Sequence, residues 1–308
     1  MAPRSVNSRP AARRGGLGRR ELHRRSEVSF TGRVVVITGA GSGIGRALAI
    51  ALAGQGALLA VSDIDGAGLD DTANQCLNAG MAARADIVDV TNREAMTAYA
   101  ADVAAQFGRV NIVFNNAGVV FTGDITKSSY DDIEHVIDVD FWGVVNGTKA
   151  FLPYLIESGA GHLINISSAF GLIAAPGYSA YNAAKFAVRG FTEAVQQEMH
   201  SAGHPVHVSC VYPGAVQTRI LQTGRYAEGE NHAAINDVFD KMARPSPAQA
   251  AATILRGVRA RKRRILVGPD AVAADLLARV GGTGYQQLFQ LIRHLQRQMD
   301  RTPARKET

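Results

Sequence analysis

The sequence predicts an α/β fold, a doubly wound parallel sheet of about seven strands with helices on both faces. Short apolar runs rich in β-branched residues alternate with helical patterns over residues 30–270, and this alternation is typical of parallel sheets. A glycine-rich turn joins the first apolar run, 33–38, to the first helical pattern, 46–53. No linker-like composition divides this region, so we expect a single domain.

The predicted elements follow one another in a regular order. The strands are continuous apolar runs, as expected for strands buried on both faces, at residues 33–38, 58–62, 82–88, 111–114, 162–166, 206–211 and 264–267. The helices lie at residues 46–53, 66–75, 94–106, 131–155, 181–199 and 247–260. Residues 215–244 break the order: they are polar and irregular, which is typical of a lid or binding loop. Residues 271–299 add two helical segments after the last strand.

The net charge is concentrated at the N-terminus. Residues 1–29 hold eight arginines and two glutamates, so they account for the whole formal charge of +6. The rest of the chain is balanced, which gives no sign of a polyanionic partner. This segment is expected to be a disordered basic tail, although its composition also fits an organelle transit peptide. We therefore divide the chain into the tail, a main domain at 30–270 and a helical extension at 271–308.

The composition is that of a soluble globular protein, with 46% hydrophobic and 19% charged residues. Cys76 and Cys210 are the only cysteines, too few for a disulfide framework and without the spacing of a metal site. No apolar run approaches the length of about 18 residues that spans a bilayer. We expect a reduced, cytoplasmic protein without a bound metal.

A glycine-rich string separates the first strand from the first helix. It reads Thr38-Gly39-Ala40-Gly41-Ser42-Gly43-Ile44-Gly45. Glycines let the backbone approach a pyrophosphate, whose charge the N-terminus of the helix stabilises. The string alone is weak evidence, but its position between a strand and a helix is the one that dinucleotide binding requires. The expected contacts are Gly39, Ser42, Gly43, Ile44 and Gly45.

Asp63 stands at the end of the second strand, about 20 residues after Gly43, the spacing of an acid that accepts hydrogen bonds from a ribose 2′-hydroxyl. Such an acid also repels a 2′-phosphate. The alternative is that Asp63 caps the helix at 66–75. Because Ser42 is not basic and no Arg or Lys follows Asp63 closely, we favour NAD over NADP as the cofactor.

Tyr181 and Lys185 are four residues apart in a helical pattern, so their side chains share one face. A phenol with a pKa of about 10 is a poor base at neutral pH. A nearby ammonium group favours the ionised phenol, so the pair is a candidate for acid–base catalysis. A chance pair on the surface is the alternative.

With these motifs, residues 30–270 resemble the ordinary branch of the short-chain dehydrogenase/reductase family. The resemblance depends on the glycine string, Asn115-Asn116-Ala117-Gly118 after the fourth strand, Ser168, the Tyr181–Lys185 pair, and Pro213-Gly214 after the sixth strand. In this order and spacing the motifs are very specific. The resemblance implies a Rossmann-type, NAD(P)-binding catalytic domain and an oxidoreductase that acts on a CH–OH group.

The resemblance also implies roles for the matching residues. Ser168 would polarise the substrate oxygen, and Tyr181 would move the hydroxyl proton. Lys185 would bind the nicotinamide ribose and lower the pKa of Tyr181. Further cofactor contacts are implied for Asp89 and Val90 at the adenine, for Asn116, Ala117 and Gly118, and for Pro213, Gly214, Val216 and Thr218 around the nicotinamide.

Asp140 departs from the family pattern. The family has an asparagine here that helps to hold a water next to the lysine, whereas this chain reads Val139-Asp140-Phe141-Trp142-Gly143. An aspartate can keep that role, so Asp140 completes the candidate catalytic set. Its charge near Lys185 would oppose the lowering of the Tyr181 pKa.

The leading hypothesis is an NAD-dependent dehydrogenase of a secondary alcohol or ketone. Phe170, Leu172, Ile173 and Tyr178 are expected around the site, which favours a bulky, apolar substrate such as a steroid, retinoid-like or lipid alcohol. The alternative is a non-catalytic NAD-binding scaffold whose tail contacts a membrane or nucleic acid. By resemblance, we expect a homo-oligomer, either a dimer or a tetramer.

The C-terminal extension contains an amphipathic pattern. Tyr285, Leu288, Leu291, Ile292, Leu295 and Met299 follow helical spacing. We expect this helix to pack on its own domain or on a sister subunit, and peripheral membrane contact is the alternative. The N-terminal tail has no aromatic residue before Phe30, so no specific nucleic-acid partner is expected.

Overall fold

The computed structural model describes residues 29–287, 289 and 290. Its main element is a seven-stranded parallel sheet with the strand order β3-β2-β1-β4-β6-β7-β9. The strands are β1 (Val34–Thr38), β2 (Leu58–Asp63), β3 (Ala83–Ile87), β4 (Ile112–Asn115), β6 (Gly161–Ile166), β7 (Val206–Pro213) and β9 (Arg264–Val267). Each overlaps a predicted strand, so the predicted fold class is confirmed.

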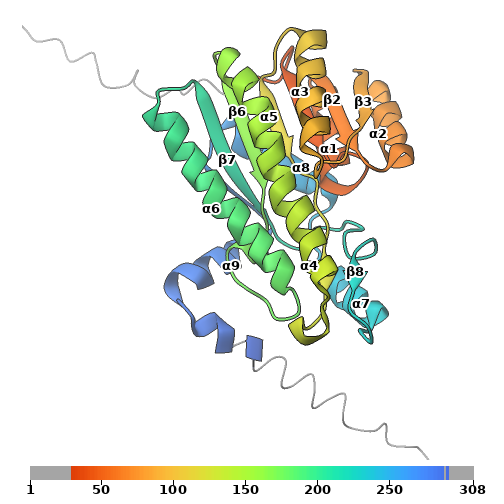
Figure 1. Ribbon diagram of the computed structural model, residues 1–308, viewed down its shortest axis with the longest axis vertical. Coiled ribbons are helices and arrows are strands. Elements are labelled where there is room, and N and C mark those ends of the chain that lie inside the picture. Colours follow the sequence, from red (N-terminus) through yellow and green to blue (C-terminus); the bar gives the residue numbers. More distant parts are fainter. Residues whose placement is uncertain (1–28, 288, 291–308) are drawn as a thin grey trace, which may run out of the picture.

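Helices cover both faces of the sheet (Figure 1). One layer holds α1 (Gly43–Ala53), α2 (Gly66–Asn78) and α8 (Pro247–Arg259). The other holds α3 (Arg93–Phe107), α4 (Tyr130–Ile137), α5 (Gly143–Glu157) and α6 (Ser179–Ser201). The long helix predicted at 131–155 is interrupted between α4 and α5 by a π-helical turn, Asp138–Trp142. Such turns often occur at functional sites, and this one carries Asp140.

The segment at 215–244 is more regular than the sequence predicts. It contains a short strand, β8 (Arg225–Tyr226), and a helix, α7 (His232–Met242). The helix begins after Asn231, whose side chain accepts a hydrogen bond from the backbone N–H of Ala234. β8 pairs with β5 (Phe121–Thr122), which is far away in the sequence. The prediction of an irregular segment is therefore wrong for these residues. The β8 pairing leaves no local pattern because its partner is distant, whereas α7 has a local signal in its cap, Asn231.

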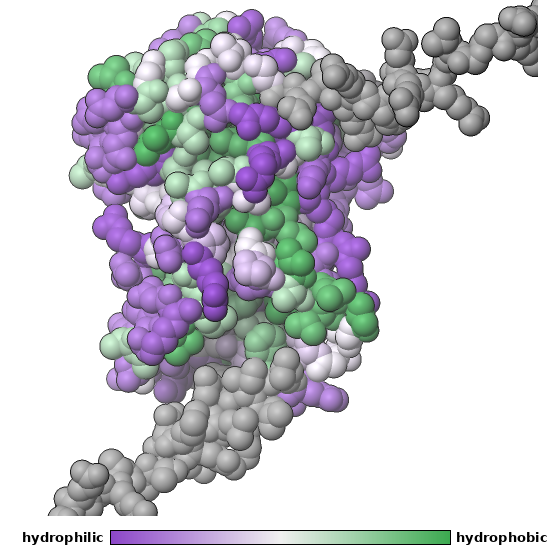
Figure 2. Space-filling model, turned by 180° about the vertical axis from the view of Figure 1, so that it is seen from behind, coloured by the Kyte–Doolittle hydropathy of each residue, from purple (hydrophilic) through white to green (hydrophobic). Residues whose placement is uncertain are grey.

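After β9 the chain continues into α9 (Pro269–Val280), which packs on the main domain. Tyr285 and Phe289, which follow α9, pack against the same cluster of buried residues, as expected for packing on the chain's own domain. The outward face of α9 exposes Val272, Leu276, Leu277 and Val280. Figure 2, in which α9 lies on the right, shows apolar residues gathered at the lower right of the molecule.

Several predictions concern residues outside the described ones. The segment expected to be a basic tail consists of residues 1–28 and Ser29, and the rest of the amphipathic pattern consists of Leu288, Leu291, Ile292, Leu295 and Met299. Within residues 29–287, 289 and 290, no helix is both long and apolar enough to cross a membrane. Cys76 and Cys210 are buried free thiols, and burial raises the pKa of each to about 11.

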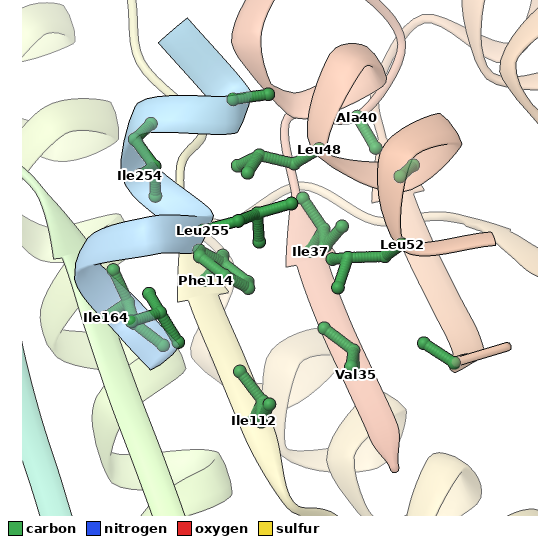
Figure 3. Packing of buried hydrophobic residues seen from close by; sticks show 14 of the residues in the cluster. Val35, Ile37, Ala40, Leu48, Leu52, Ile112, Phe114, Ile164, Ile254 and Leu255 are labelled. Atoms are coloured by element: carbon green, nitrogen blue, oxygen red, sulfur yellow. The ribbon is translucent and has the colours of Figure 1, made fainter. Parts of the chain in front are cut away.

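The largest core cluster lies between the sheet and the helices α1 and α8 (Figure 3). β1 and β4 direct every second side chain toward these helices, as the two-residue period of a strand requires. The alternate residues, such as Val34 and Val36, are buried against the other layer, which explains the continuous apolar runs. Core members on the α1 and α8 side are Val35, Ile37, Leu48, Leu52, Ile112, Phe114, Ile254 and Leu255, each at most 2% exposed.

The strand order determines where a ligand can bind. The chain moves outward from β1 through β2 to β3, and then returns to start the other half of the sheet at β4. In sheets of this kind, ligands bind at the carboxyl ends of the strands next to this reversal. The glycine turn follows β1 and the Asn115–Gly118 motif follows β4, so both lie at this edge.

Candidate active site

Two glycines of the turn between β1 and α1 have no room for a side chain. A Cβ atom at Gly39 would lie 2.6 Å from the Cα of Ala117, and one at Gly45 would lie 2.1 Å from the carbonyl oxygen of Gly39. Gly39 and Gly43 also have φ angles of 65° and 54°, which residues with a Cβ disfavour. Glycine is therefore required at these positions for the path of the turn, and its backbone can approach a ligand closely there.

The N-terminus of α1 is suited to an anion. Ser42 precedes the helix, but its side chain makes no capping hydrogen bond, and the first turn carries no acidic residue. The first N–H groups of a helix have no partner within the helix, and the helix dipole favours negative charge there. These features fit the pyrophosphate of a dinucleotide. Ile44, in the same turn, packs partly buried against the core.

Thr38 and Asn116 connect the glycine turn to the segment after β4. The side-chain amide of Asn116 donates to the carbonyl oxygens of Thr38 at 2.9 Å and Gly39 at 3.0 Å. The hydroxyl of Thr38 accepts from the backbone N–H groups of Asn116 at 3.0 Å and Ala117 at 3.2 Å. The structure thus brings Asn116 and Ala117 against the turn that the sequence assigned to the same ligand.

Asp63 lies beside the glycine turn. One carboxylate oxygen accepts from the N–H of Gly41 at 2.7 Å, and the other from the N–H of Asp65 at 3.0 Å. The residue that caps α2 is Asp65, which accepts from the N–H of Gly68 at 3.1 Å. The alternative in which Asp63 caps this helix is therefore wrong. Asp63 remains a candidate for binding a ribose hydroxyl.

A cation at the glycine turn was missed from the sequence, where only Ser42 and the residues that follow Asp63 were considered for a basic side chain. Arg46, in α1, donates to the carbonyl oxygens of Gly41 and Gly68. It also pairs with Asp71 at 2.6 Å. The protein's own carbonyl and carboxylate groups therefore already bind the Arg46 guanidinium group, although it lies next to Gly41 in the glycine turn.

Asp89 and Val90 follow β3. The Asp89 carboxylate accepts from the backbone N–H of Thr91 at 2.9 Å and from its hydroxyl at 2.8 Å, so it stabilises its own turn. Val90 is 7% exposed, and its side chain would meet a Cβ at Gly143 at 2.7 Å. Asn146, which sequence reasoning missed, donates to the Val90 carbonyl at 2.9 Å and fixes this backbone to α5.

The three residues of the expected acid–base set meet at the carboxyl edge of the sheet. Ser168 follows β6, and its hydroxyl is close enough to the phenol of Tyr181, near the start of α6, to lower the pKa of that phenol. Lys185 lies one helical turn after Tyr181, with Nζ 5.5 Å from the centroid of the Tyr181 ring. A hydrogen bond from the N–H of Phe170 to the Ser168 hydroxyl, at 3.1 Å, orients that hydroxyl.

Asp140 contacts Lys185 directly. Its side chain is fully buried, and one carboxylate oxygen lies 3.0 Å from Lys185 Nζ. The other oxygen accepts from the N–H of Val119 at 2.7 Å. Lys185 Nζ also donates to the carbonyl of Ile166 at 3.4 Å. The π-helical turn therefore places a carboxylate against the lysine, where the family pattern has a neutral amide.

These charges act on the pKa of Tyr181. Burial raises that pKa, Lys185 lowers it, Asp140 raises it, and the Ser168 hydroxyl lowers it; the net result is above the usual value of 10. Burial lowers the pKa of Lys185, but the negative charges of Asp140 and Tyr181 outweigh burial and raise it. Lys185 therefore keeps its proton at neutral pH, and Asp140 opposes its effect on the phenol.

The segment after β7 reaches across to the glycine turn. The N–H of Gly214 donates to the carbonyl of Val267 at 2.9 Å, and Val216 is buried in the core. The methyl group of Thr218 would lie 3.2 Å from a Cβ at Gly43. Pro213, Gly214, Val216 and Thr218 thus border the same edge of the sheet as the glycine turn, as the sequence predicts.

Tyr181 belongs to a small group of aromatic side chains centred on Phe170. Phe170 packs against Tyr178 and Tyr181, with ring centroids 5.2 Å and 6.3 Å apart. Leu172 and Ile173, expected beside the site, are instead buried in a cluster that includes residues of α9. They pack there because α9 covers this stretch, and the sequence offers no local signal for that contact.

Comparisons with known proteins agree with this geometry. A family model described as short chain dehydrogenase matches residues 33–229. SadH of Mycobacterium tuberculosis, named as an oxidoreductase, is 54% identical over 261 residues, which are 84% of this chain and 95% of that protein. Human estradiol 17-beta-dehydrogenase 11 is 36% identical over 195 residues, 63% of this chain and 65% of that protein.

A solved structure gives the same result. The structure of a short-chain dehydrogenase/reductase from Burkholderia phymatum in complex with NAD matches with a TM-score of 0.76 and 29% identity. The match covers 91% of this chain and 99% of that chain. The chain described here belongs to the short-chain dehydrogenase/reductase family of oxidoreductases.

Proposed function

We propose that this protein is an NAD-dependent dehydrogenase that interconverts a secondary alcohol and a ketone. The observation that carries the proposal is the meeting of Ser168, Tyr181 and Lys185 next to the glycine turn, at the reversal of strand order. A proton-transfer group and a dinucleotide cradle at one edge of a sheet are what hydride exchange with an alcohol requires.

NAD is the proposed cofactor, and when bound it supplies the nicotinamide that exchanges the hydride. The glycine turn and the N-terminus of α1 would hold the pyrophosphate, and Asp63 would accept hydrogen bonds from the adenosine ribose. Asp89 and Val90 would border the adenine. The contacts proposed beyond these are Asn116, Ala117, Gly118, Tyr181, Lys185, Pro213, Gly214, Val216 and Thr218.

In the proposed reaction, Ser168 donates a hydrogen bond to the substrate oxygen. During oxidation Tyr181 accepts the hydroxyl proton, and during reduction it donates a proton to the carbonyl oxygen. Lys185 stabilises the phenolate with its charge. Asp140 acts through Lys185: the ion pair holds the ammonium group in place and offsets part of its field.

A bulky, apolar substrate is supported by two observations. The ring of Phe170 lies beside Tyr181 and also packs against Tyr178, and aromatic walls favour apolar ligands. The name of the human relative specifies a steroid, estradiol. We therefore infer that the substrate is a steroid, a retinoid-like or another lipid alcohol, or the matching ketone.

We also infer a cytoplasmic homo-oligomer. Two reduced, buried cysteines fit a reducing compartment. Trp142 and Phe186, at the long central helices, are 39% and 38% exposed, and large exposed apolar side chains are common at subunit interfaces.

The test is a panel of steroid, retinoid, fatty and short secondary alcohols, with the matching ketones, assayed by NADH absorbance. We expect turnover of at least one bulky apolar compound with NAD(H). Binding of NADH without turnover of any compound would instead support a non-catalytic NAD-binding scaffold. That second candidate is favoured by one observation, the buried Asp140–Lys185 ion pair that offsets the lysine charge.

A further inference from the structure

The C-terminal segment after β9 packs against the loop that carries Ser168. Ala271 and Ala274 of α9 share a buried cluster with Ala169 and Leu172. This contact brings residues from the end of the described chain to within reach of both sides of the candidate active site. Two polar side chains of the segment each accept one hydrogen bond there. Asp270 accepts from the turn after β7, and Tyr285 accepts from the loop after Ser168.

Asp270 lies against the turn proposed to border the nicotinamide. One carboxylate oxygen accepts from the N–H of Ala215 at 2.5 Å. A Cβ atom at Gly214 would lie only 2.0 Å from this oxygen, so the carboxylate can approach because residue 214 is a glycine. The second carboxylate oxygen is buried, and none of the described residues donates a hydrogen bond to it.

A buried carboxylate oxygen without a donor is unfavourable for stability. Replacing Asp270 by an apolar residue would remove that cost, together with the hold on Ala215. The carboxylate lies in the first turn of α9, where the helix dipole favours a negative charge, and its bond to Ala215 fixes the position of the Pro213–Gly214–Ala215 turn.

Tyr285 makes its hydrogen bond on the other side of the candidate active site, to the loop that follows Ser168. Its hydroxyl accepts from the N–H of Ala174 at 3.2 Å, in the segment that joins Ser168 to Tyr178. The next residue, Ala175, is held from within the domain by Asn182, whose side-chain amide donates to the Ala175 carbonyl at 2.7 Å. Tyr285 thus adds a second hydrogen bond that fixes this loop, from a segment that lies outside the parallel sheet.

We propose that Asp270 and Tyr285 are positioning residues, through which the C-terminal segment sets the distance between the nicotinamide turn and the Ser168 loop. Asp270 acts on the cofactor side and Tyr285 acts on the substrate side. The inference rests on the proposed function, because it assigns the two loops to cofactor and substrate.

The cofactor side is tested by titrating the full-length protein with NADH and recording its fluorescence, which needs no substrate. Asp270→Ala removes the acceptor, and we expect about a tenfold weaker affinity for NADH, the effect of losing one hydrogen bond to a charged group. Asp270→Asn keeps an acceptor oxygen and should lose less than Asp270→Ala. This second variant also serves if Asp270→Ala fails to fold.

Asp275→Asn is the matched control, because Asp275 lies on the same helix and pairs with Arg264 at 2.5 Å and Arg279 at 3.0 Å. It changes a carboxylate to an amide in α9 without touching the Ala215 turn. We expect NADH affinity to stay within about twofold of the unaltered protein, a change below 1 kcal/mol. Equal weakening in Asp270→Ala and Asp275→Asn would show that α9 acts only through overall stability.

The substrate side is tested with Tyr285→Phe, which keeps the ring that packs near Phe289 and removes only the hydroxyl. We expect faster hydrogen exchange at residues 172–176 and a several-fold lower kcat, with NADH affinity unchanged. Tyr154→Phe, on α5, is the matched control and should alter neither quantity.

NADH binding by the unaltered protein distinguishes a failure of the proposed function from a failure of the inference about Asp270 and Tyr285. If the unaltered protein does not bind NADH, the proposed function and this inference fall together. If it binds NADH but Asp270→Ala binds equally well, or Tyr285→Phe leaves exchange at 172–176 unchanged, the inference alone is overturned.

Discussion

Around the glycine turn, the geometry of the site depends on glycines that let backbone segments approach closely, whereas around Tyr181 it depends on buried charged side chains. A Cβ at Gly45 would meet a carbonyl oxygen at 2.1 Å, so volume decides the geometry of the nucleotide half. In the half around Tyr181, which we call the reacting half, Asp140 and Lys185 are both buried and lie 3.0 Å apart. The properties of this half therefore depend on charge.

Because the two halves depend on different physical properties, substitutions should damage them in different ways. A small increase in volume should damage the nucleotide half, because a packed backbone has nowhere to move. The reacting half should tolerate changes that keep the shape, but its pH dependence should follow the local charge. Four substitutions test this contrast.

The largest effect is expected for Tyr181→Phe, in the reacting half. The ring still packs, but no proton can move, so kcat should fall by about 10²–10⁴-fold. NADH affinity should stay within about twofold of normal, below 1 kcal/mol. Steady-state kinetics on the best substrate of the panel, together with NADH titration, measure both. The assignment of Tyr181 is falsified if the variant retains most of its kcat.

Gly45→Ala should damage the nucleotide half through volume alone. Overpacking costs about 1–3 kcal/mol, which corresponds to a loss of NADH affinity of roughly 5–150-fold if it falls on the bound state. Gly190→Ala, in α6, is the matched control, because a Cβ there meets nothing within 4 Å. Normal NADH binding by Gly45→Ala would mean that the turn can move, and that volume does not govern this half.

Asp63→Ala should change cofactor choice rather than overall binding. The Asp63 carboxylate lies at the glycine turn, where it would accept from a ribose hydroxyl and repel a 2′-phosphate. We expect the preference for NAD(H) over NADP(H) to fall by about tenfold. Titrations with both cofactors measure the ratio, and a clear NADP(H) preference in the unaltered protein would contradict the assignment.

The smallest change is expected for Asp140→Asn, which removes a charge and nearly keeps the shape. Oxidation needs the Tyr181 phenolate, so activity rises as pH approaches the Tyr181 pKa, which burial and then Asp140 raise while Lys185 lowers it. Without the Asp140 charge, the alkaline-rising limb of kcat/KM should move to lower pH by about one unit or less. The limb reports an apparent value for the coupled groups.

A shift of that limb to higher pH would contradict the electrostatic argument. It would mean that Lys185, whose raised pKa depends in part on Asp140, loses its proton in the variant. An unchanged profile would mean that the Asp140 carboxyl is already neutral when the enzyme works.

Much of the fold and of the candidate site could be predicted because the signals are local. The apolar runs that became β1 and β4 needed only their own residues and the rule that buried parallel strands are apolar throughout. The glycine turn, Asp63 and the Tyr181–Lys185 pair could be named for the same reason. The paired strands β5 and β8 could not, since each is two residues long and its partner is distant in sequence.

The order of strands and helices, the residues that can exchange protons and the glycines that leave the backbone accessible could all be derived from the amino-acid sequence. These follow from the period and chemistry of neighbouring side chains. Only the tertiary structure decided that Asp140 pairs with Lys185, that Arg46 reaches Gly41, and that Asp270 and Tyr285 hold the two loops. Most of these contacts join residues far apart in the chain, so they exist only once the core has packed.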